Sequence, residues 1–289
     1  MIVSASYRTD IPAFYGDWFA RRWTAGSCQV RSPYGGPPST VALGPEVVRG
    51  LVFWTRNARP FFPVLAGLAD QAVPFVVQYT LTGYSRALDR SVPARDHGIA
   101  AIRELARRYG PDAVVWRYDP IVLTTVTPRQ WHRETVTILA AALAGSVNEV
   151  VVSFVEPYRK TARHLATLAR TDGIVWRDPV PDEKRAMLEE MAGDVAAHGM
   201  RLTLCTQPLL VTEHLPAARC IDSQRLSLVA GRAIEAREKG NRPGCRCAES
   251  RDIGRYDTCP HGCVYCYAVD SRNRAVQYQH DHDPRQAAL

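Results

Sequence analysis

The stretch "AVVWRYD" (Ala113 to Asp119) begins with apolar residues typical of a buried strand and ends with polar residues. The same pattern recurs along the chain. Short runs rich in Val, Ile and aromatic residues, bounded by turn residues, predict strands that are buried on both faces. Five other stretches have the same character: "MIVSAS" (1–6), "LVFWT" (51–55), "PFVVQYT" (74–80), "EVVVSFVE" (149–156) and "RLTLCTQ" (201–207). The sequence therefore predicts about six strands.

The segments between these runs have helical periodicity, with apolar residues three and four apart and a glycine at or near the end of most. They include 94–110, 128–145, 158–173 and 182–200. Alternating strands and helices predict an α/β fold with parallel strands and right-handed crossovers. We expect a partial or complete TIM-like (β/α) barrel over residues 1–240, and a cysteine-rich segment, 241–289, packed on its mouth within one structural domain. The tail after Asp270 is polar and is expected to pack weakly.

The start of the chain has no signal-peptide pattern, and no window approaches the ~20 apolar residues that cross a bilayer. We therefore expect a cytoplasmic protein with no membrane partner. The net charge of +7 permits a nucleic-acid partner, although basic residues are scattered and a solvated basic surface is the simpler interpretation. Eight cysteines in a reducing compartment indicate metal binding or redox chemistry rather than disulfides.

Polar residues follow each predicted strand. In a parallel barrel all strands end at one mouth, where active sites of such folds are built. The strand ends supply candidate site residues, which include Arg8, Asp10, Arg56, Arg117 and Asp119. Any one of them could instead cap a helix or form a turn. As a set they predict a site, because buried arginines beside carboxylates are costly in a merely structural loop.

The stretch "DTCPHGCVYCYAV" (257–269) holds Cys259, Cys263 and Cys266. A C-x3-C-x2-C spacing lets three thiolates from one loop bind three irons of a [4Fe-4S] cubane and leaves the fourth iron open. A zinc site that includes His261 is the alternative, although this spacing is awkward for one tetrahedral ion.

This spacing, with Tyr265 before the last cysteine, resembles the motif of radical S-adenosylmethionine (SAM) enzymes. The resemblance implies that SAM binds the open iron and that an external electron donor reduces the cluster. Cleavage of SAM then yields a 5′-deoxyadenosyl radical, which abstracts hydrogen from a substrate. In that family the motif follows the first strand, so here the barrel would be permuted. Within this interpretation the cofactor is bound by Arg8, Arg56 or Arg117 through anionic groups, by Asp10 or Asp119 through ribose hydroxyls, and at Tyr265.

Four further cysteines are Cys205, Cys220, Cys245 and Cys247. Together they suggest a second cluster, ligated by four thiolates, or a zinc site. The simpler alternative is that Cys205 is a small buried hydrophobe. Cys28 is isolated and is expected to be a buried neutral residue.

The segments "SASYRTDIPAFYGDWF", "LVFWTRNARP", "VVWRYDPIVL", "VVSFVEPYRKT" and "DIGRYDTCPHGCVYCYA" make the chain similar to a bacterial family catalogued as domain of unknown function 1848. The resemblance supports the cysteine cluster and names no reaction. We therefore expect a radical SAM enzyme with an unknown substrate. One alternative is radical repair or modification of nucleic acid, since the motif is similar to that of spore photoproduct lyases. A non-catalytic zinc or iron–sulfur binding protein is the other alternative.

Overall fold

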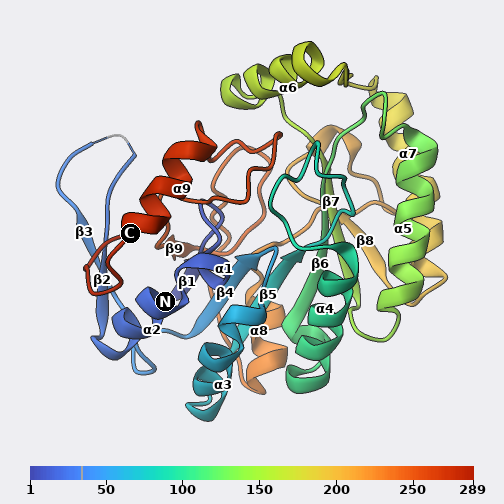
Figure 1. Ribbon diagram of the computed structural model, residues 1–289. Helices are drawn as coiled ribbons and strands as arrows, with labels where there is room; N and C mark the ends of the chain where they lie inside the picture. Colours follow the sequence, from blue (N-terminus) through green and yellow to red (C-terminus); the bar gives the residue numbers. More distant parts are fainter. Residues whose placement is uncertain (34) are drawn as a thin grey trace.

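A seven-stranded parallel sheet forms the centre of the computed structural model, which describes residues 1–33 and 35–289 (Figure 1). The strand order is β8-β7-β6-β5-β4-β1-β9. From β1 to β8 the neighbouring strands follow the order of the chain, so each crossover adds the next strand on the same side of the last. A separate antiparallel pair is made by β2 (Ser27–Val30) and β3 (Ser39–Ala42).

All six predicted strands are confirmed. They are β1 (Ile2–Ala5), β4 (Gly50–Thr55), β5 (Phe75–Thr80), β6 (Val114–Ile121), β7 (Glu149–Phe154) and β8 (Arg201–Leu204). The sequence missed β9 (Ser250–Asp252), which pairs in parallel with β1. Its residues, "SRD", carry no apolar side chain, so periodicity gives no signal there. This strand depends on pairing with a segment almost 250 residues earlier.

The predicted helices between the later strands are confirmed. The α-helices are α1 (Ile11–Phe14), α2 (Gly16–Thr24), α3 (Phe62–Asp70), α4 (Arg95–Tyr109), α5 (Arg129–Leu143), α6 (Arg159–Asp172), α7 (Pro181–Ala196), α8 (Ser223–Ala230) and α9 (Arg272–Asp281). After β8 the chain forms one short helix, α8, before the cysteine-rich segment. Gly231, at φ 62°, ends that helix in the left-handed conformation that glycine adopts without strain.

Side chains alternate between two layers along each sheet strand. Val3, Leu51 and Phe53 belong to the main core, which also contains buried residues of α2 to α5 and α7. Their neighbours Ile2 and Val52 belong to a second cluster on the opposite face of the sheet. That cluster also contains residues of α8 and of the cysteine-rich segment. The sheet is therefore covered on one face by the crossover helices and on the other by chain from the C-terminal third.

The polar tail is attached to the rest of the protein at a few points, although most of residues 271–289 stay at least partly exposed. The Trp18 indole N–H donates to the Gln286 carbonyl at 3.1 Å, and Ala275 and Leu289 are buried. Figure 1 shows the C-terminal segment lying against the N-terminal helices. These attachments are two apolar side chains and hydrogen bonds to backbone carbonyls, which the mean polarity of the segment does not reveal.

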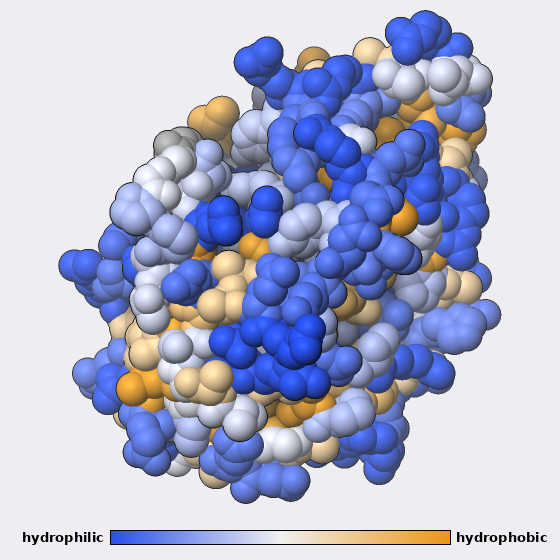
Figure 2. All heavy atoms as spheres, turned by 60° about the vertical axis from the view of Figure 1, so that its left-hand side comes forward, coloured by the Kyte–Doolittle hydropathy of each residue, from blue (hydrophilic) through white to orange (hydrophobic). Residues whose placement is uncertain are grey.

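Hydrophilic side chains surround several smaller hydrophobic patches on the face shown in Figure 2. Within the described residues, no helix has both the length and the apolar character that a bilayer crossing requires. Cys28 is 2% exposed, which confirms the expected burial, and desolvation raises the pKa of its thiol to about 12.

The packing of α8 against the sheet can be tested with two leucines of the same helix. Leu226 is fully buried, and its side chain fills the space beside Gly50 at the start of β4. We expect Leu226→Ala to lower the free energy of unfolding by about 2–5 kcal/mol, because it leaves a cavity. Leu228 is 69% exposed, and Leu228→Ala should change it by less than about 0.5 kcal/mol. Denaturant titration followed by circular dichroism measures both, and equal midpoints for the two variants would contradict this packing.

Candidate functional site

The cysteine loop, residues 257–269, crosses the edge of the sheet where the parallel strands end. It is bound by backbone hydrogen bonds to the chain that follows β5. The Val264 N–H donates to the Leu88 carbonyl at 2.9 Å, and the Ser91 N–H donates to the His261 carbonyl at 2.9 Å. Helix α6 packs on the other side, through Leu165 and Leu168. The loop is thus a fixed part of the carboxyl edge.

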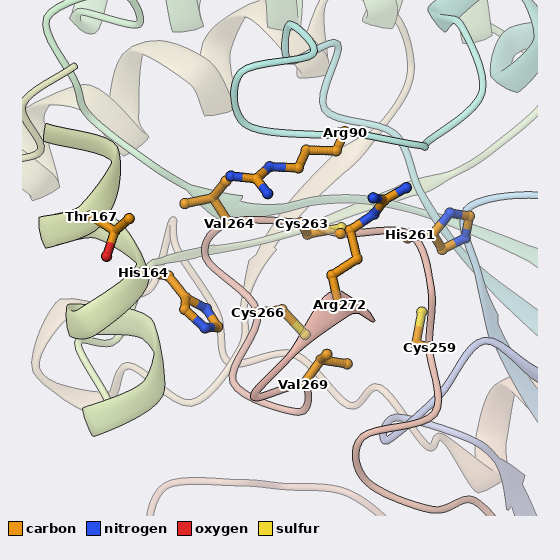
Figure 3. A pocket seen from close by; sticks show the side chains of 11 residues that line it. Arg90, His164, Thr167, Cys259, His261, Cys263, Val264, Cys266, Val269 and Arg272 are labelled. Atoms are coloured by element: carbon orange, nitrogen blue, oxygen red, sulfur yellow. The ribbon is translucent and has the colours of Figure 1, made fainter. Parts of the chain in front are cut away.

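Cys259, Cys263 and Cys266 line one cavity of about 200 Å³. Figure 3 shows their side chains on the curved loop, with His164 and Thr167 of α6 on one side of the cavity. The loop turns at Gly262, which has φ 74°. A Cβ atom there would also lie 2.4 Å from the Arg272 side chain, so both the turn and the close approach require glycine.

The three thiols lie in a weakly solvated environment. Desolvation raises the pKa of Cys259, Cys263 and Cys266, so without a cation beside them they are neutral. The Arg56 guanidinium opposes this effect at Cys263, because its Nη1 donates to Sγ at 3.2 Å. A cation bound in the cavity would have to displace these protons.

Arg56 joins three parts of the site. Its guanidinium donates to both carboxylate oxygens of Asp89, at 3.0 and 2.7 Å, and to the Thr82 hydroxyl at 2.7 Å. The Tyr265 hydroxyl lies 2.5 Å from Arg56 Nη1 and donates to Asp89 at 2.6 Å. Side-chain exposure of the ion pair is 10% for Arg56 and 4% for Asp89. The structure therefore brings the predicted Arg56, Tyr265 and Cys263 together around a carboxylate that the sequence analysis missed.

Asp10 is occupied by three protein donors. One oxygen accepts from the Ala13 N–H at 2.9 Å and so caps α1. The other accepts from the Arg56 N–H at 2.8 Å and lies 2.8 Å from His261 Nε2. Asp10 thus serves as a helix cap, and His261 Nε2 is bound to it rather than free for a metal ion.

Arg8 belongs to a separate cluster at the end of β1. Its Nε lies 3.6 Å from Asp252 of β9, and its guanidinium lies over the Tyr7 and Tyr256 rings. The Asp252 carboxylate also accepts from the Ser4 and Ser6 hydroxyls at 2.8 and 2.7 Å. No sequence pattern indicated Asp252, because the short strand that carries it was not predicted. Arg8 does not line the cavity of the three cysteines.

Arg117 and Asp119 form a further polar group on the face of the sheet that α8 covers. Arg117 pairs with Asp119, which also accepts from the Ser153 hydroxyl. The guanidinium lies over the Trp54 ring, 4.9 Å from its centroid, and donates to Cys220 Sγ at 3.0 Å. Arg117 is 4% exposed. These two predicted residues therefore lie beside the second cysteine group and not in the first cavity.

The four remaining predicted cysteines are adjacent in space. Cys205 and Cys220 have their Sγ atoms 3.6 Å apart. Cys247 Sγ accepts from the Ile221 N–H at 3.3 Å, directly after Cys220 in the chain. Interaction with the neighbouring Cys247 side chain lowers the pKa of the half-buried Cys245 to about 6. The predicted site residues thus divide between two cysteine groups, with Arg8 apart from both.

No group of three or more His, Cys, Asp or Glu side chains in residues 1–33 and 35–289 is arranged to hold a metal ion. One zinc ion bonds each thiolate at about 2.3 Å, so its ligands must crowd around a single point. The cysteines of a cubane each bond a different iron, and their sulfurs surround a larger body.

Fold and site together define an α/β protein with a parallel sheet and a C-terminal cysteine loop fixed at the carboxyl edge of that sheet. The chain belongs to the family described as Domain of unknown function (DUF1848), whose model matches residues 2–268. Searches of curated proteins and of solved structures gave no significant match.

The buried Arg56–Asp89 pair should be essential to the loop's stability. Asp89→Asn keeps the shape of the side chain but leaves the Arg56 charge without its carboxylate. We expect the free energy of unfolding to fall by about 3–5 kcal/mol. Asp96→Asn is the matched control, since Asp96 is 91% exposed and pairs loosely with Arg95 at 3.9 Å. Its effect in the same denaturant titration should be below about 0.5 kcal/mol. A similar decrease in the free energy of unfolding in both variants would show that the buried Arg56–Asp89 pair does not stabilise the fold more than an exposed pair does.

Proposed function

We propose that this protein is an iron–sulfur enzyme of the radical SAM type. The observation that carries the proposal is that Cys259, Cys263 and Cys266 line one cavity at the carboxyl edge of a parallel sheet. We further propose that the sheet is an open (β/α) barrel, because its strands from β1 to β8 follow the order of the chain and β9 returns beside β1. A C-terminal loop then occupies the mouth that an N-terminal loop occupies in the enzymes it resembles.

The donor set of the cavity fits a cubane with one open iron. Three thiols are available. Two histidines also line the cavity, and both have protein partners: His261 Nε2 lies 2.8 Å from an Asp10 oxygen, and His164 Nε2 lies 3.0 Å from the Asp270 carbonyl oxygen. When bound, the cluster supplies the electron that cleaves SAM and releases the 5′-deoxyadenosyl radical. The reducing electron comes from an external donor.

Arg56 has a positioning role in this proposal. Its guanidinium already pairs with Asp89 and donates to Thr82, so both Nη atoms are occupied and only the buried Nε has no partner among the described residues. Its remaining contacts are with the Tyr265 hydroxyl and Cys263 Sγ. A hydrogen bond to a ligating sulfur stabilises negative charge there and raises the reduction potential of a cluster.

Arg90 and Arg272 are better placed to bind anionic groups at the cavity. Both line it, and neither forms an ion pair with any residue that the structure describes. Figure 3 shows both arginine side chains extending across the cavity. The cavity, at about 200 Å³, is smaller than the ~300–1,000 Å³ typical of drug-sized ligands. It therefore suits the cluster, and most of SAM would lie outside it. Arg8 and Arg117, which are paired with Asp252 and Asp119, fit a cofactor role less well.

The ligand assignment predicts loss of SAM cleavage on changing any one of the three cysteines. Cys259→Ala, Cys263→Ala and Cys266→Ala should each reduce 5′-deoxyadenosine formation to the level without protein, because the cubane loses a corner. The assay uses anaerobically reconstituted protein, SAM and a chemical reductant, with chromatographic detection of the product. Far-ultraviolet circular dichroism checks that each variant is folded.

Cys28→Ala is the control, because Cys28 is buried in β2 and lies outside both cysteine groups. It should retain normal cleavage. Wild-type levels of 5′-deoxyadenosine in any triplet variant would contradict the ligand assignment. Stoichiometric zinc and no SAM cleavage in the reconstituted wild-type protein would overturn the proposed function.

A further inference from the structure

Cys205 and Cys220 place two thiols in contact on the α8 side of the sheet. Their Sγ atoms lie 3.6 Å apart, although the residues are 15 positions apart in the chain. Cys205 is partly exposed, whereas Cys220 is 3% exposed and belongs to the apolar cluster that includes α8. Neither residue lines the cavity of the first cysteine group. The pair is therefore a separate chemical feature, which the proposed function does not use.

Hydrogen bonds hold the two chain segments side by side. The Ala218 N–H donates to the Leu204 carbonyl at 2.8 Å, as part of a short parallel bridge that ends directly before Cys205. The Gln78 side-chain amide donates to the Cys220 carbonyl, also at 2.8 Å. Because the backbone is held on both sides, each thiol stays near the other, and its effective concentration there is high.

The surroundings of the pair suit the chemistry of thiol oxidation. Arg117 Nη1 donates to Cys220 Sγ at 3.0 Å, while its Nη2 pairs with Asp119. A guanidinium beside the sulfur stabilises the negative charge that Cys220 carries when it attacks another sulfur atom. Cys205 is the more exposed of the two, so a small oxidant from solvent meets it first.

Without an oxidant the pair is a protonated dithiol. The contact with Cys220, together with burial, raises the pKa of Cys205 well above its usual range. At Cys220 the neighbouring Cys205 lowers the pKa, but Cys247 and burial raise it, and the net value is about 12. Both thiols therefore keep their protons at neutral pH, and the resting state is reduced.

We propose that Cys205 and Cys220 form a reversible disulfide when the protein is exposed to a peroxide. The peroxide oxidises the Cys205 thiol to a sulfenic acid, and one water is released. Cys220 Sγ then attacks the Cys205 sulfur and the S–S bond forms. The hydroxyl of the sulfenic acid leaves with the Cys220 proton as a second water. Two thiols and one peroxide thus give one disulfide and two waters, and a dithiol reductant reverses the reaction by exchange.

The movement that the reaction needs is small. The two sulfurs approach from 3.6 Å to the disulfide bond length of about 2.05 Å. Both cysteines lie outside regular elements, since Cys205 comes directly after β8 and Cys220 comes before α8. The new bond would tie the end of β8 to the segment that leads into α8, the helix on this face of the sheet.

Peptide mapping tests the proposal, because trypsin separates the four cysteines of this region. The peptides are 202–219 with Cys205, 220–225 with Cys220, 240–246 with Cys245 and 247–251 with Cys247. The native full-length chain is treated with hydrogen peroxide, the remaining thiols are alkylated, and the digest is analysed by mass spectrometry without reduction. We expect 202–219 joined to 220–225, and dithiothreitol should release both peptides.

Two variants provide the matched comparison. Cys220→Ser should abolish the link and leave Cys205 as a sulfenic acid that dimedone labels, because no thiol is then in place to resolve it. Cys28→Ser should form the link as the wild type does, since Cys28 is buried in β2 away from the pair. Circular dichroism checks the fold of both variants.

Several results would overturn the proposal. They are full alkylation of Cys205 and Cys220 after peroxide treatment, a link from either residue to Cys247 or Cys245 instead, and an equal yield of the link in protein unfolded before oxidation. If Cys220→Ser does not fold, the comparison of native with unfolded wild-type protein decides. The link requires neither SAM nor iron, so its outcome is independent of the proposed function.

Discussion

The buried charge of Arg56 is the constraint on which the carboxyl edge of the sheet depends. A guanidinium that is removed from water has to be paired, and its partners come from two distant segments: Asp89 after β5, and Tyr265 with Cys263 in the C-terminal loop. Satisfying the arginine therefore fixes the loop against the sheet. The cysteine cavity exists in its present shape because this network holds one of its three thiols.

Alternation along the strands separates the two cysteine groups. Residues such as Leu51 and Phe53 face the crossover helices, whereas Val52 and Trp54 face α8 and the segment that carries Cys245. The second cysteine group lies on this α8-covered face, and the first lies at the edge between the loop and α6. One parallel sheet thus carries two groups of cysteines, one that lines a cavity and one that packs against the α8-covered face.

The end of the chain contacts its beginning at several places. β9 pairs with β1, Asp252 accepts from the Ser4 and Ser6 hydroxyls, and Trp18 donates to the Gln286 carbonyl. This return allows a C-terminal loop to occupy the carboxyl edge of a sheet whose first strand begins at Ile2. A cysteine loop near the end of the sequence therefore lies beside the ends of strands from its beginning.

The sequence by itself determined six strands, four of the crossover helices and the three cysteines of the loop, because local periodicity and close spacing carry that information. Only the tertiary structure decided the rest. It added β9 and the attachments of the tail, assigned Asp10 to a helix cap, and supplied Asp89 and Asp252 as the partners of Arg56 and Arg8. These features depend on hydrogen bonds and charges paired across long separations in the chain. No local pattern of residues records such pairings.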